Sequence, residues 1–338
     1  MKSGGSFATT FLKKKVRKVD GIIIINKPQW FTSFDVIAKL RKQLKTKKVG
    51  HTGTLDPMAT GVLVVCIGKA TPLVNILTSE EKVYRTTIKL GIETDTADLT
   101  GRITRYIKED KIFESNDLNL KTLENQTKNV KYISDIAMIN YNNNNVFSNE
   151  IKFDLDNNKI IDVIKGFIGK QDQIPPLYSS IKIDGKKLYE YARKGENVEI
   201  PSRKIEIYDI KDICYDGNNE LSYTVHCSKG TYIRSLNEDI AKKLGLIGTT
   251  MHLERIKTGK FSIENAICIN DVDESKIIPI EKLFDKKIVL EDSQEKMLLN
   301  GIEIESENEN GIYNLYIGEK YYGLGEVKDK KLKRYIIL

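Results

Sequence analysis

The chain has 338 residues, of which 40% are hydrophobic and 30% are charged, and this predicts a folded, soluble protein with two packed domains. Its 54 Lys and Arg exceed its 47 Asp and Glu by 54 − 47 = 7, a modest net charge that does not by itself identify a partner. The longest apolar runs, residues 22–25 and 62–67, are far shorter than the roughly 18 to 20 residues of a membrane-spanning helix, which rules out a membrane protein. The four cysteines are far apart without a CxxC pair and there are only three histidines, so a disulfide scaffold is excluded, a zinc site is disfavoured and a reduced, cytosol-like compartment fits best.

Residues 1–18 form a basic N-terminal tail with six Lys or Arg and no acid. Such a tail is either an RNA-touching arm or an organelle transit peptide. Because transit peptides are usually Arg-rich and this tail is Lys-rich, we favour the arm.

The first ordered elements follow directly. Residues 21–25 are a short apolar strand, and residues 33–44 read as a helix with Ser33 as its N-cap and with Phe34, Ile37, Leu40 and Leu44 recurring at helical spacing. A loop rich in Gly and Thr over residues 50–61 leads into a buried strand at 62–67. Residues 82–91 alternate as a strand does, with Tyr84 on one face.

Residues 106–158 differ in composition from the rest of the chain. They hold 12 Asn among 53 residues, and 9 acids against 6 lysines. A stretch this polar buries little core, so we interpret it as a mostly surface insertion without a function of its own, with one short helix or strand near 130–139.

Order then returns and continues to the C-terminus. We expect an ordered segment at 160–168, an extended segment at 174–183, a short helix at 186–194, strands at 204–208 and 221–227, and a helix at 234–244 that Gly245 ends. After residue 283, short alternating segments punctuated by glycine predict an appended all-β unit of about 50 residues.

Asp56 is the strongest candidate for chemistry. It lies in the 50–61 loop, before Pro57, and residues 36–55 contain six Lys or Arg and no acid. A lone carboxylate beside a basic strip suits an anionic polymer that is held by its phosphates and attacked by the acid. The alternative is a turn aspartate that caps Ala59 or Thr60.

Other chemistries lack their residues. A glycosidase needs a second facing carboxylate, a base deaminase needs H-x-E and P-C-x-x-C, and nucleotide cofactors need a glycine-rich loop that opens a helix. The sequence offers none of these, so we predict neither a cofactor nor a metal.

Three more residues have both a functional and a structural interpretation. His51 shares the loop of Asp56 and is either a site residue or structural. Tyr84 could stack on a base or belong to the core. Arg234 could pair with a buried carboxylate and hold it ionised, or be a solvated arginine at a helix start.

The combination of motifs closely resembles the bacterial TruB family of tRNA pseudouridine synthases, over residues 20–261 apart from the Asn-rich insertion. The motifs are Asn26-Lys-Pro28, Gly50-His-Thr-Gly-Thr-Leu-Asp-Pro-Met-Ala-Thr-Gly-Val-Leu63, Tyr84-Arg85, Pro176-Leu-Tyr-Ser-Ser-Ile-Lys182, Ser228-Lys-Gly-Thr-Tyr-Ile-Arg-Ser235 and Leu253-Glu-Arg-Ile-Lys-Thr-Gly259. The resemblance implies an α+β pseudouridine-synthase fold, in which helices flank a mixed, largely antiparallel sheet and a small all-β PUA-like module follows. The implied domains are the tail at 1–18, a catalytic domain at 19–285 and the RNA-binding module at 286–338.

The resemblance also implies roles for individual residues. Asp56 matches the catalytic aspartate, Tyr84 the tyrosine that stacks on the target base and is implicated in proton removal, and Arg234 the arginine that pairs with the aspartate. The remaining matches are contacts to the flipped uridine or its neighbours, at His51, Tyr232 and Leu253, and the pair that supports the floor of the site, Lys27 and Pro28. Residues 184–203 match a thumb-like segment that closes on RNA.

The implied activity is the isomerisation of uridine 55 to pseudouridine in the T loop of tRNA, without a cofactor, by a monomer in the cytoplasm. An organelle is the alternative location if the basic tail is a transit peptide. The competing classes are a non-catalytic RNA-binding protein and, more remotely, a hydrolase of small sugars.

Overall fold

The computed structural model describes residues 20–108, 111–114 and 152–338. Its centre is an eleven-stranded sheet in the order β15-β1-β3-β13-β4-β12-β11-β8, with β2, β14 and β16 paired beside it. Most neighbours are antiparallel, while β1 with β15 and β3 with β13 are parallel. The bounds are β1 Gly21–Lys27, β2 Val49–His51, β3 Thr60–Ile67, β4 Lys82–Leu90, β8 Gly169–Gln173, β11 Arg203–Tyr215, β12 Glu220–Cys227, β13 Gly248–Thr258, β14 Phe261–Ser262, β15 Ile267–Cys268 and β16 Ile278–Pro279.

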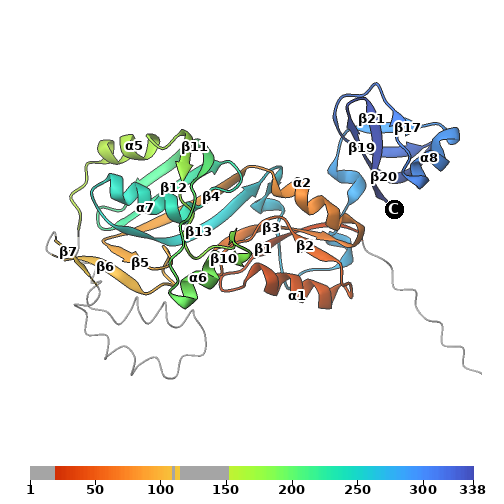
Figure 1. Cartoon of the computed structure of the whole chain (residues 1–338). Helices are drawn as coiled ribbons and strands as arrows, with labels where there is room; N and C mark the ends of the chain where they lie inside the picture. The colour runs from red at the N-terminus through yellow and green to blue at the C-terminus, as the bar shows by residue number, and fades with distance from the viewer. Residues whose placement is uncertain (1–19, 109–110, 115–151) are drawn as a thin grey trace, which may run out of the picture.

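Helices and small sheets surround this large sheet (Figure 1). Among the described residues these helices are α1 Ser33–Gln43, α2 Val74–Thr78, α5 Asn157–Lys165, α6 Leu188–Lys194 and α7 Ile233–Lys243, while α8 Glu295–Asn300 belongs to the C-terminal unit. The small sheets are β5 Ile92–Thr94 with β6 Ile103–Lys108 and β7 Lys111–Glu114, and the pair β9 Lys182–Ile183 with β10 Lys186–Lys187. The mixed α+β architecture is therefore as predicted.

Strands β1 and β3 are buried on both faces, as their continuous apolar runs predict. In β1, Ile22 and Ile24 pack into one core cluster, whereas Ile23 and Ile25 pack into another under α1. The register of β1 against β3 is unbroken from Gly21 opposite Ile67 to Lys27 opposite Gly61. The loop that carries Asp56 thus runs between β2 and β3, both of which pair in the most buried part of the sheet.

Helix α1 begins one residue earlier than its sequence pattern suggests. The N-cap is Thr32, not Ser33, because Thr32 and Asp35 form a capping box in which each side chain accepts from the other's backbone. Ser33 instead exchanges hydrogen bonds with the backbone of Leu55. Phe34 does not face the core, since it is 69% exposed. The other residues of the predicted stripe, Ile37, Leu40 and Leu44, are buried.

Helix α7 matches its prediction closely and carries a buried polar network. It runs over Ile233–Lys243, and Gly245 follows it with φ of +83°. The side chain of Asn237 donates to the hydroxyls of Thr86 and Thr250 and accepts from Tyr223 at 2.6 Å. One amide therefore joins α7 to the three central strands β4, β12 and β13.

The predicted Asn-rich insertion is not wholly a surface segment. Tyr106 and Ile107, near the end of β6, are buried, and Phe153 packs in the main core. Both ends of the 106–158 range thus belong to the fold. The short element expected near 130–139 and the basic tail 1–18 lie outside the described residues.

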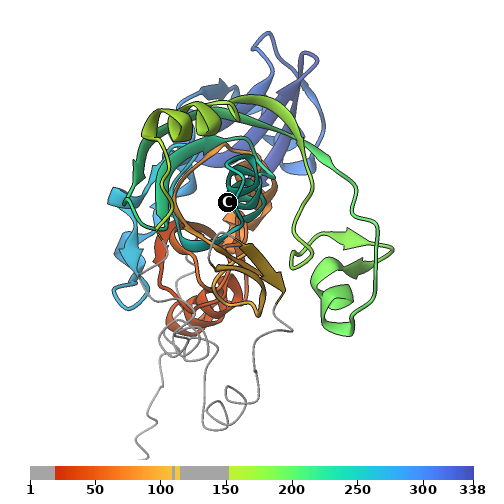
Figure 2. The ribbon, with the colours of Figure 1, turned by 90° about the vertical axis from the view of Figure 1, so that its left-hand side faces the viewer.

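The segment expected to close on RNA, residues 184–203, contains β10, which pairs with the preceding β9, and helix α6. Residues 186–187 form β10, so the predicted 186–194 helix starts at Leu188. Of the predicted extended segment 174–183, only Lys182–Ile183 is a strand. Figure 2 shows this segment standing away from the sheet.

The C-terminal unit is a five-stranded sheet in the order β17-β19-β20-β21-β18, with its own core. Its strands are β17 Lys287–Leu290, β18 Ile304–Glu305, β19 Gly311–Ile317, β20 Lys320–Lys328 and β21 Lys331–Ile337. It is not purely β, because α8 is part of it. Leu324 and Ile336 join the core cluster under β1 and β3, and the Tyr335 hydroxyl donates to the Pro72 carbonyl at 3.2 Å, so the module packs on the large domain.

None of the helices in the described ranges is long and apolar enough to cross a membrane.

The Asn237 network leads to a prediction about stability. Asn237→Ala removes three hydrogen bonds and leaves the hydroxyls of Tyr223, Thr86 and Thr250 without this partner, so we expect the free energy of unfolding to fall by about 3 kcal/mol. Urea unfolding measures this. Asn158→Ala, at an exposed position of α5, is the control and should change stability by less than about 0.5 kcal/mol. Equal effects of the two substitutions would show that the network does not stabilise α7.

A second prediction concerns Glu238, also on α7. Burial, with the nearby Glu93 and Asp239, raises the pKa of Glu238 from 4.5 to about 7. The unfolded chain therefore releases this proton at lower pH than the fold does, so stability declines as pH rises from about 4.5 to 7 and stays lower above. Glu238→Gln should unfold with a free energy about 2 kcal/mol above wild type at pH 8 and near wild type at pH 4.5, by urea titration. A gain of equal size at both pH values would contradict the assignment, and exposed Glu319→Gln is the control.

Candidate active site

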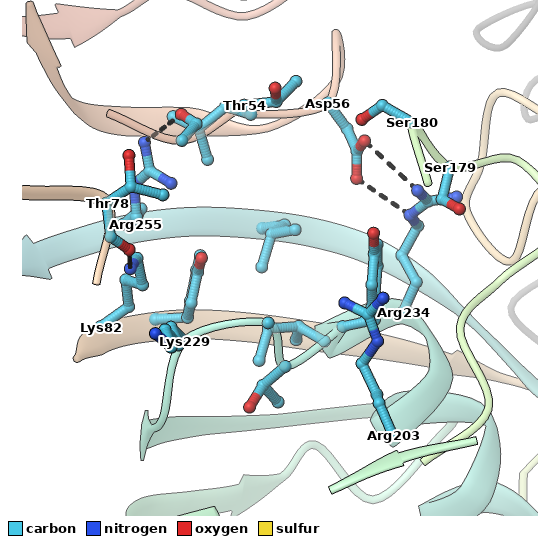
Figure 3. Close-up of a pocket in the computed structure, with 18 of the residues that line it drawn as sticks. Thr54, Asp56, Thr78, Lys82, Ser179, Ser180, Arg203, Lys229, Arg234 and Arg255 are labelled. Atoms are coloured by element: carbon cyan, nitrogen blue, oxygen red, sulfur yellow. Dashed lines mark hydrogen bonds and ion pairs between the residues drawn. The ribbon is translucent and has the colours of Figure 1, made fainter. Parts of the chain in front are cut away.

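A pocket of about 580 Å³ opens over the middle of the large sheet. It is lined from the β2–β3 loop, β4, the loop before β9, the start of β11, the turn into α7, and β13. Figure 3 shows Asp56 and Arg234 facing each other on one side, with Lys82 and Lys229 on the other. The pocket size is within the range of sites that enclose small molecules or single nucleotides.

A buried lysine side chain holds the loop that carries Asp56 through hydrogen bonds to backbone carbonyls. The ammonium of Lys27 donates to the carbonyls of Pro28, Phe31 and Pro57, at 3.0, 2.5 and 3.2 Å. Lys27 is fully buried, and this burial lowers its pKa to about 8 although the charge of Asp56 opposes the shift. Neither Lys27 nor Pro28 lines the pocket, so the implied role in supporting the floor of the site stays a prediction.

Asp56 and Arg234 form the central ion pair. The Nε of Arg234 lies 2.9 Å from Oδ2 of Asp56, and Nη2 donates to Oδ1 at 3.3 Å. The Arg234 side chain is 3% exposed, whereas that of Asp56 is 33% exposed. The interpretation of Arg234 as a solvated arginine at a helix start is therefore wrong. The carboxylate is not fully buried but opens into the pocket, where it can reach a ligand.

Three further groups complete the surroundings of Arg234. Its Nη1 donates to the carbonyl of Thr96 at 2.7 Å, its Nη2 donates to that of Tyr178 at 2.9 Å, and Asp98 lies 3.8 Å from Nη1. Burial alone would lower the pKa of Arg234, but the charges of Asp56 and Asp98 outweigh it and raise the pKa. Burial likewise raises the pKa of Asp98. The guanidinium is fixed in one orientation and remains charged.

Tyr84 belongs to the core and also lines the pocket, so its stacking on a base stays a prediction. It is 8% exposed and belongs to the main core cluster, and its side chain also lines the pocket. Burial raises the pKa of Tyr84, although the charge of Arg255 opposes this. The phenol is therefore un-ionised near neutral pH and offers a flat wall to a bound ring.

Tyr232 and Leu253 also line the pocket, and the contacts to the flipped uridine that the resemblance implies for them stay predictions. The backbone N–H and carbonyl of Tyr232, the N-cap residue of α7, both bond to the side-chain amide of Gln173. Burial raises the pKa of Tyr232. Leu253, on β13, is 5% exposed and supplies apolar surface.

His51 lies outside the pocket, so its expected contact stays a prediction. Its ring meets the edge of Phe34 with centroids 5.9 Å apart. Burial and the charge of Arg255 lower the pKa of His51. Within the described part of the chain, its Nδ1 has no hydrogen-bond partner.

Sequence reasoning missed Arg255 and Asp98. Arg255 is 2% exposed, lines the pocket, and donates to the carbonyls of Val62 and Gly53 at 2.8 and 3.1 Å. Its place in the motif 253–259 was the available signal. Gly61, at φ of +102°, is required here because a Cβ would lie 2.2 Å from the Arg255 carbonyl oxygen. Asp98 had no signal, since only the fold brings it to Arg234.

Among the described residues, no group of three or more His, Cys, Asp or Glu side chains is placed to hold a metal ion. The chemistry available in the pocket is that of one carboxylate, an aromatic wall and several cations. This set suits an anionic substrate whose reacting atom meets Asp56.

The fold agrees with that of chains in two solved complexes. A chain of the "Crystal Structure of a Cbf5-Nop10-Gar1 Complex" superposes with a TM-score of 0.61 at 21% identity, covering 94% of this chain and 85% of that one. A chain of the "Structure of H/ACA RNP bound to a substrate RNA containing 2'-deoxyuridine" gives 0.59 at 20% identity, covering 94% and 84%. At these identities the likeness is one of fold, and it confirms the predicted pseudouridine-synthase fold with its C-terminal module.

Sequence comparisons are more specific. Residues 41–142 and 120–233 match the family described as "TruB family pseudouridylate synthase (N terminal domain)". A protein of Clostridium tetani named tRNA pseudouridine synthase B is 38% identical over 320 residues, which cover 91% of this chain and 96% of that protein. Its namesake in Oenococcus oeni is 39% identical over 277 residues, covering 78% of each. The chain belongs to the TruB family of pseudouridylate synthases.

Proposed function

We propose that the protein isomerises uridine 55 to pseudouridine in the T loop of tRNA, with Asp56 as the catalytic carboxylate. Membership of the family makes it a pseudouridine synthase, and its relatives' name, tRNA pseudouridine synthase B, supports tRNA as the substrate. The observation that carries the role of Asp56 is its position: it is a partly open carboxylate, held by Arg234, in a pocket lined by cations.

The reaction breaks the bond between ribose C1′ and N1 of uracil and forms one between C1′ and C5. The hydrogen on C5 is lost to solvent and N1 gains one, so the product is an isomer and no redox equivalent is consumed. The uridine must first leave its stack, which costs a few kcal/mol. Asp56 then attacks C1′ or removes a ribose proton to give a glycal, and both routes require the ionised carboxylate.

The other residues of the pocket hold the reacting groups. Arg234 fixes the direction of the Asp56 carboxylate through two nitrogen–oxygen contacts. Tyr84, Tyr232 and Leu253 surround the space beside it and would stack on or enclose the detached ring while it rotates. A closed and oriented site of this kind favours rejoining over loss of the base.

The segment 184–203 would close on the RNA. Its aromatic and basic side chains pair in cation–π contacts, with Lys186 over Tyr191 at 5.4 Å and both Lys187 and Arg193 over Tyr189 at 5.3 Å. The C-terminal module at 286–338 is proposed as a second RNA contact. The family resemblance also supports action as a monomer in the cytoplasm, or in an organelle if residues 1–18 are a transit peptide.

The proposal predicts the behaviour of Asp56→Asn. This substitution keeps the size of the side chain but removes its charge and nucleophilicity, so we expect it to abolish tritium release from C5-labelled uridine in a T stem-loop transcript. Binding of the same transcript, measured by filter retention, should stay within about threefold of wild type because other residues hold the phosphates.

The control is Asp162→Asn on α5, an exposed carboxylate that does not line the pocket. It should release tritium at the wild-type rate. Turnover by Asp56→Asn near the rate of this control would refute the catalytic role of Asp56. Binding of RNA without any turnover by wild type would instead favour a non-catalytic RNA-binding protein.

A further inference from the structure

The pocket contains more positive charge than Asp56 requires. Asp56 is the sole carboxylate among the described residues that line it. Six cations line it as well: Lys82, Arg203, Lys204, Lys229, Arg234 and Arg255. Cations gathered in one concave space repel one another unless each has a partner, so the partner of each one is informative.

Four of the six have partners in the protein. Arg234 pairs with Asp56, and Lys204 pairs with Asp172 at 3.2 Å. Arg255 donates to two backbone carbonyls. Lys82, which is 7% exposed, donates to the carbonyl of Thr78 at 2.9 Å and to that of Glu80. Arg234, Arg255 and Lys82 are thus buried and bonded within the pocket wall, whereas Lys204 is paired at its exposed rim.

The remaining two, Arg203 and Lys229, have no carboxylate partner within the described residues. The Nε of Arg203 is buried without a hydrogen-bond partner in the same part of the chain, which is costly unless a ligand completes it. Its guanidinium lies over the ring of Tyr232, 5.7 Å from the centroid.

The two side chains belong to one wall of the pocket. A Cβ on Gly230, next to Lys229, would lie 3.4 Å from Nη1 of Arg203. Beyond Lys229 lies Lys82, whose pKa burial and the charges of Arg255 and Lys229 lower to about 8. Figure 3 shows Lys229 beside Lys82, and Arg203 extending into the same space from below. An anion placed between them would relieve this repulsion.

We propose that Arg203 and Lys229 form a subsite for a backbone phosphate that flanks the flipped nucleotide. The inference rests on the proposed function, because it takes RNA as the ligand. The planar guanidinium suits two phosphate oxygens, and the lysine adds a point charge. Fixing a phosphate beside the base fixes the distance from the ribose to Asp56, so these are positioning residues for the reaction.

The first experiment measures binding in the full chain carrying Asp56→Asn, so that the RNA is not converted. Arg203→Met and Lys229→Met are compared with Lys211→Met, which removes the same charge from an exposed position of β11 outside the pocket. Each pocket variant should bind a T stem-loop RNA about tenfold more weakly. The slope of log affinity against log salt should fall by about 0.7 to 0.9 for each lost phosphate contact. Thermal unfolding shows whether each variant is folded.

A chemical probe then tests the phosphate itself. Synthetic stem-loops carry one neutral methylphosphonate, either 5′ or 3′ of the target uridine. At one of these positions the neutral linkage should weaken binding to the Asp56→Asn protein about tenfold and cause no further loss with Arg203→Met or Lys229→Met. Losses that simply multiply at both positions would overturn the subsite, as would pocket variants that bind and respond to salt as Lys211→Met does.

The two proposals fail in different ways. Wild-type protein incubated with unmodified tRNA must form pseudouridine, or the proposed function is wrong whatever the binding data show. If wild type is active, the fold increase in KM caused by Arg203→Met should exceed the fold decrease in kcat about tenfold. The reason is that a flanking phosphate is bound in both the ground and transition states. A loss confined to kcat would overturn the phosphate subsite, because the contact would then not be made in the ground state, while leaving the function intact.

Discussion

The ion pair between Asp56 and Arg234 is the interaction on which the rest of the site depends. It joins the β2–β3 loop to the first turn of α7, two segments 178 residues apart in the chain. The guanidinium is almost fully buried, so removing its partner would leave a charge that burial strongly disfavours. Contacts other than this ion pair must therefore fix the position of α7. Gln173 holds the backbone of Tyr232 at the helix start, and Asn237 ties the next turn to the three central strands.

Backbone carbonyls, rather than carboxylates, compensate most of the other buried cations. Lys27, Lys82 and Arg255 each donate to at least two carbonyl oxygens at positions with little or no exposure. A carbonyl satisfies the N–H groups but does not cancel the charge. The site consequently stays electropositive around a single acid, and an incoming polyanion meets a favourable field without competing carboxylates. This explains how a chain with a modest overall charge can hold a strongly cationic pocket.

Local patterns predicted what depends on local physics. The apolar runs of β1 and β3, the stripe and terminal glycine of α7, and the Asp56 loop were all readable because periodicity and turn chemistry determine them. The position of Thr32 as N-cap and the exposure of Phe34 were not predicted, since the hydrogen bonds of Ser33 to Leu55 turn that part of α1 toward the Asp56 loop. Asp98 and Arg255 were missed for a related reason. Their importance comes from partners far away in sequence, which spacing cannot show.

The charge of the C-terminal module limits the part it can play in holding RNA. Residues 286–338 contain 9 Lys or Arg and 10 Asp or Glu, so their net charge is 9 − 10 = −1. Several of the cations are also paired within the module, since Lys331 and Lys333 both contact Glu303, and Lys330 contacts Glu307. Affinity for RNA comes mainly from phosphate neutralisation, which a surface of this kind supplies weakly. Of the described residues, those of the large domain would then supply the main phosphate contacts, and no carboxylate of the described part of the chain pairs with Arg203 or Lys229 there.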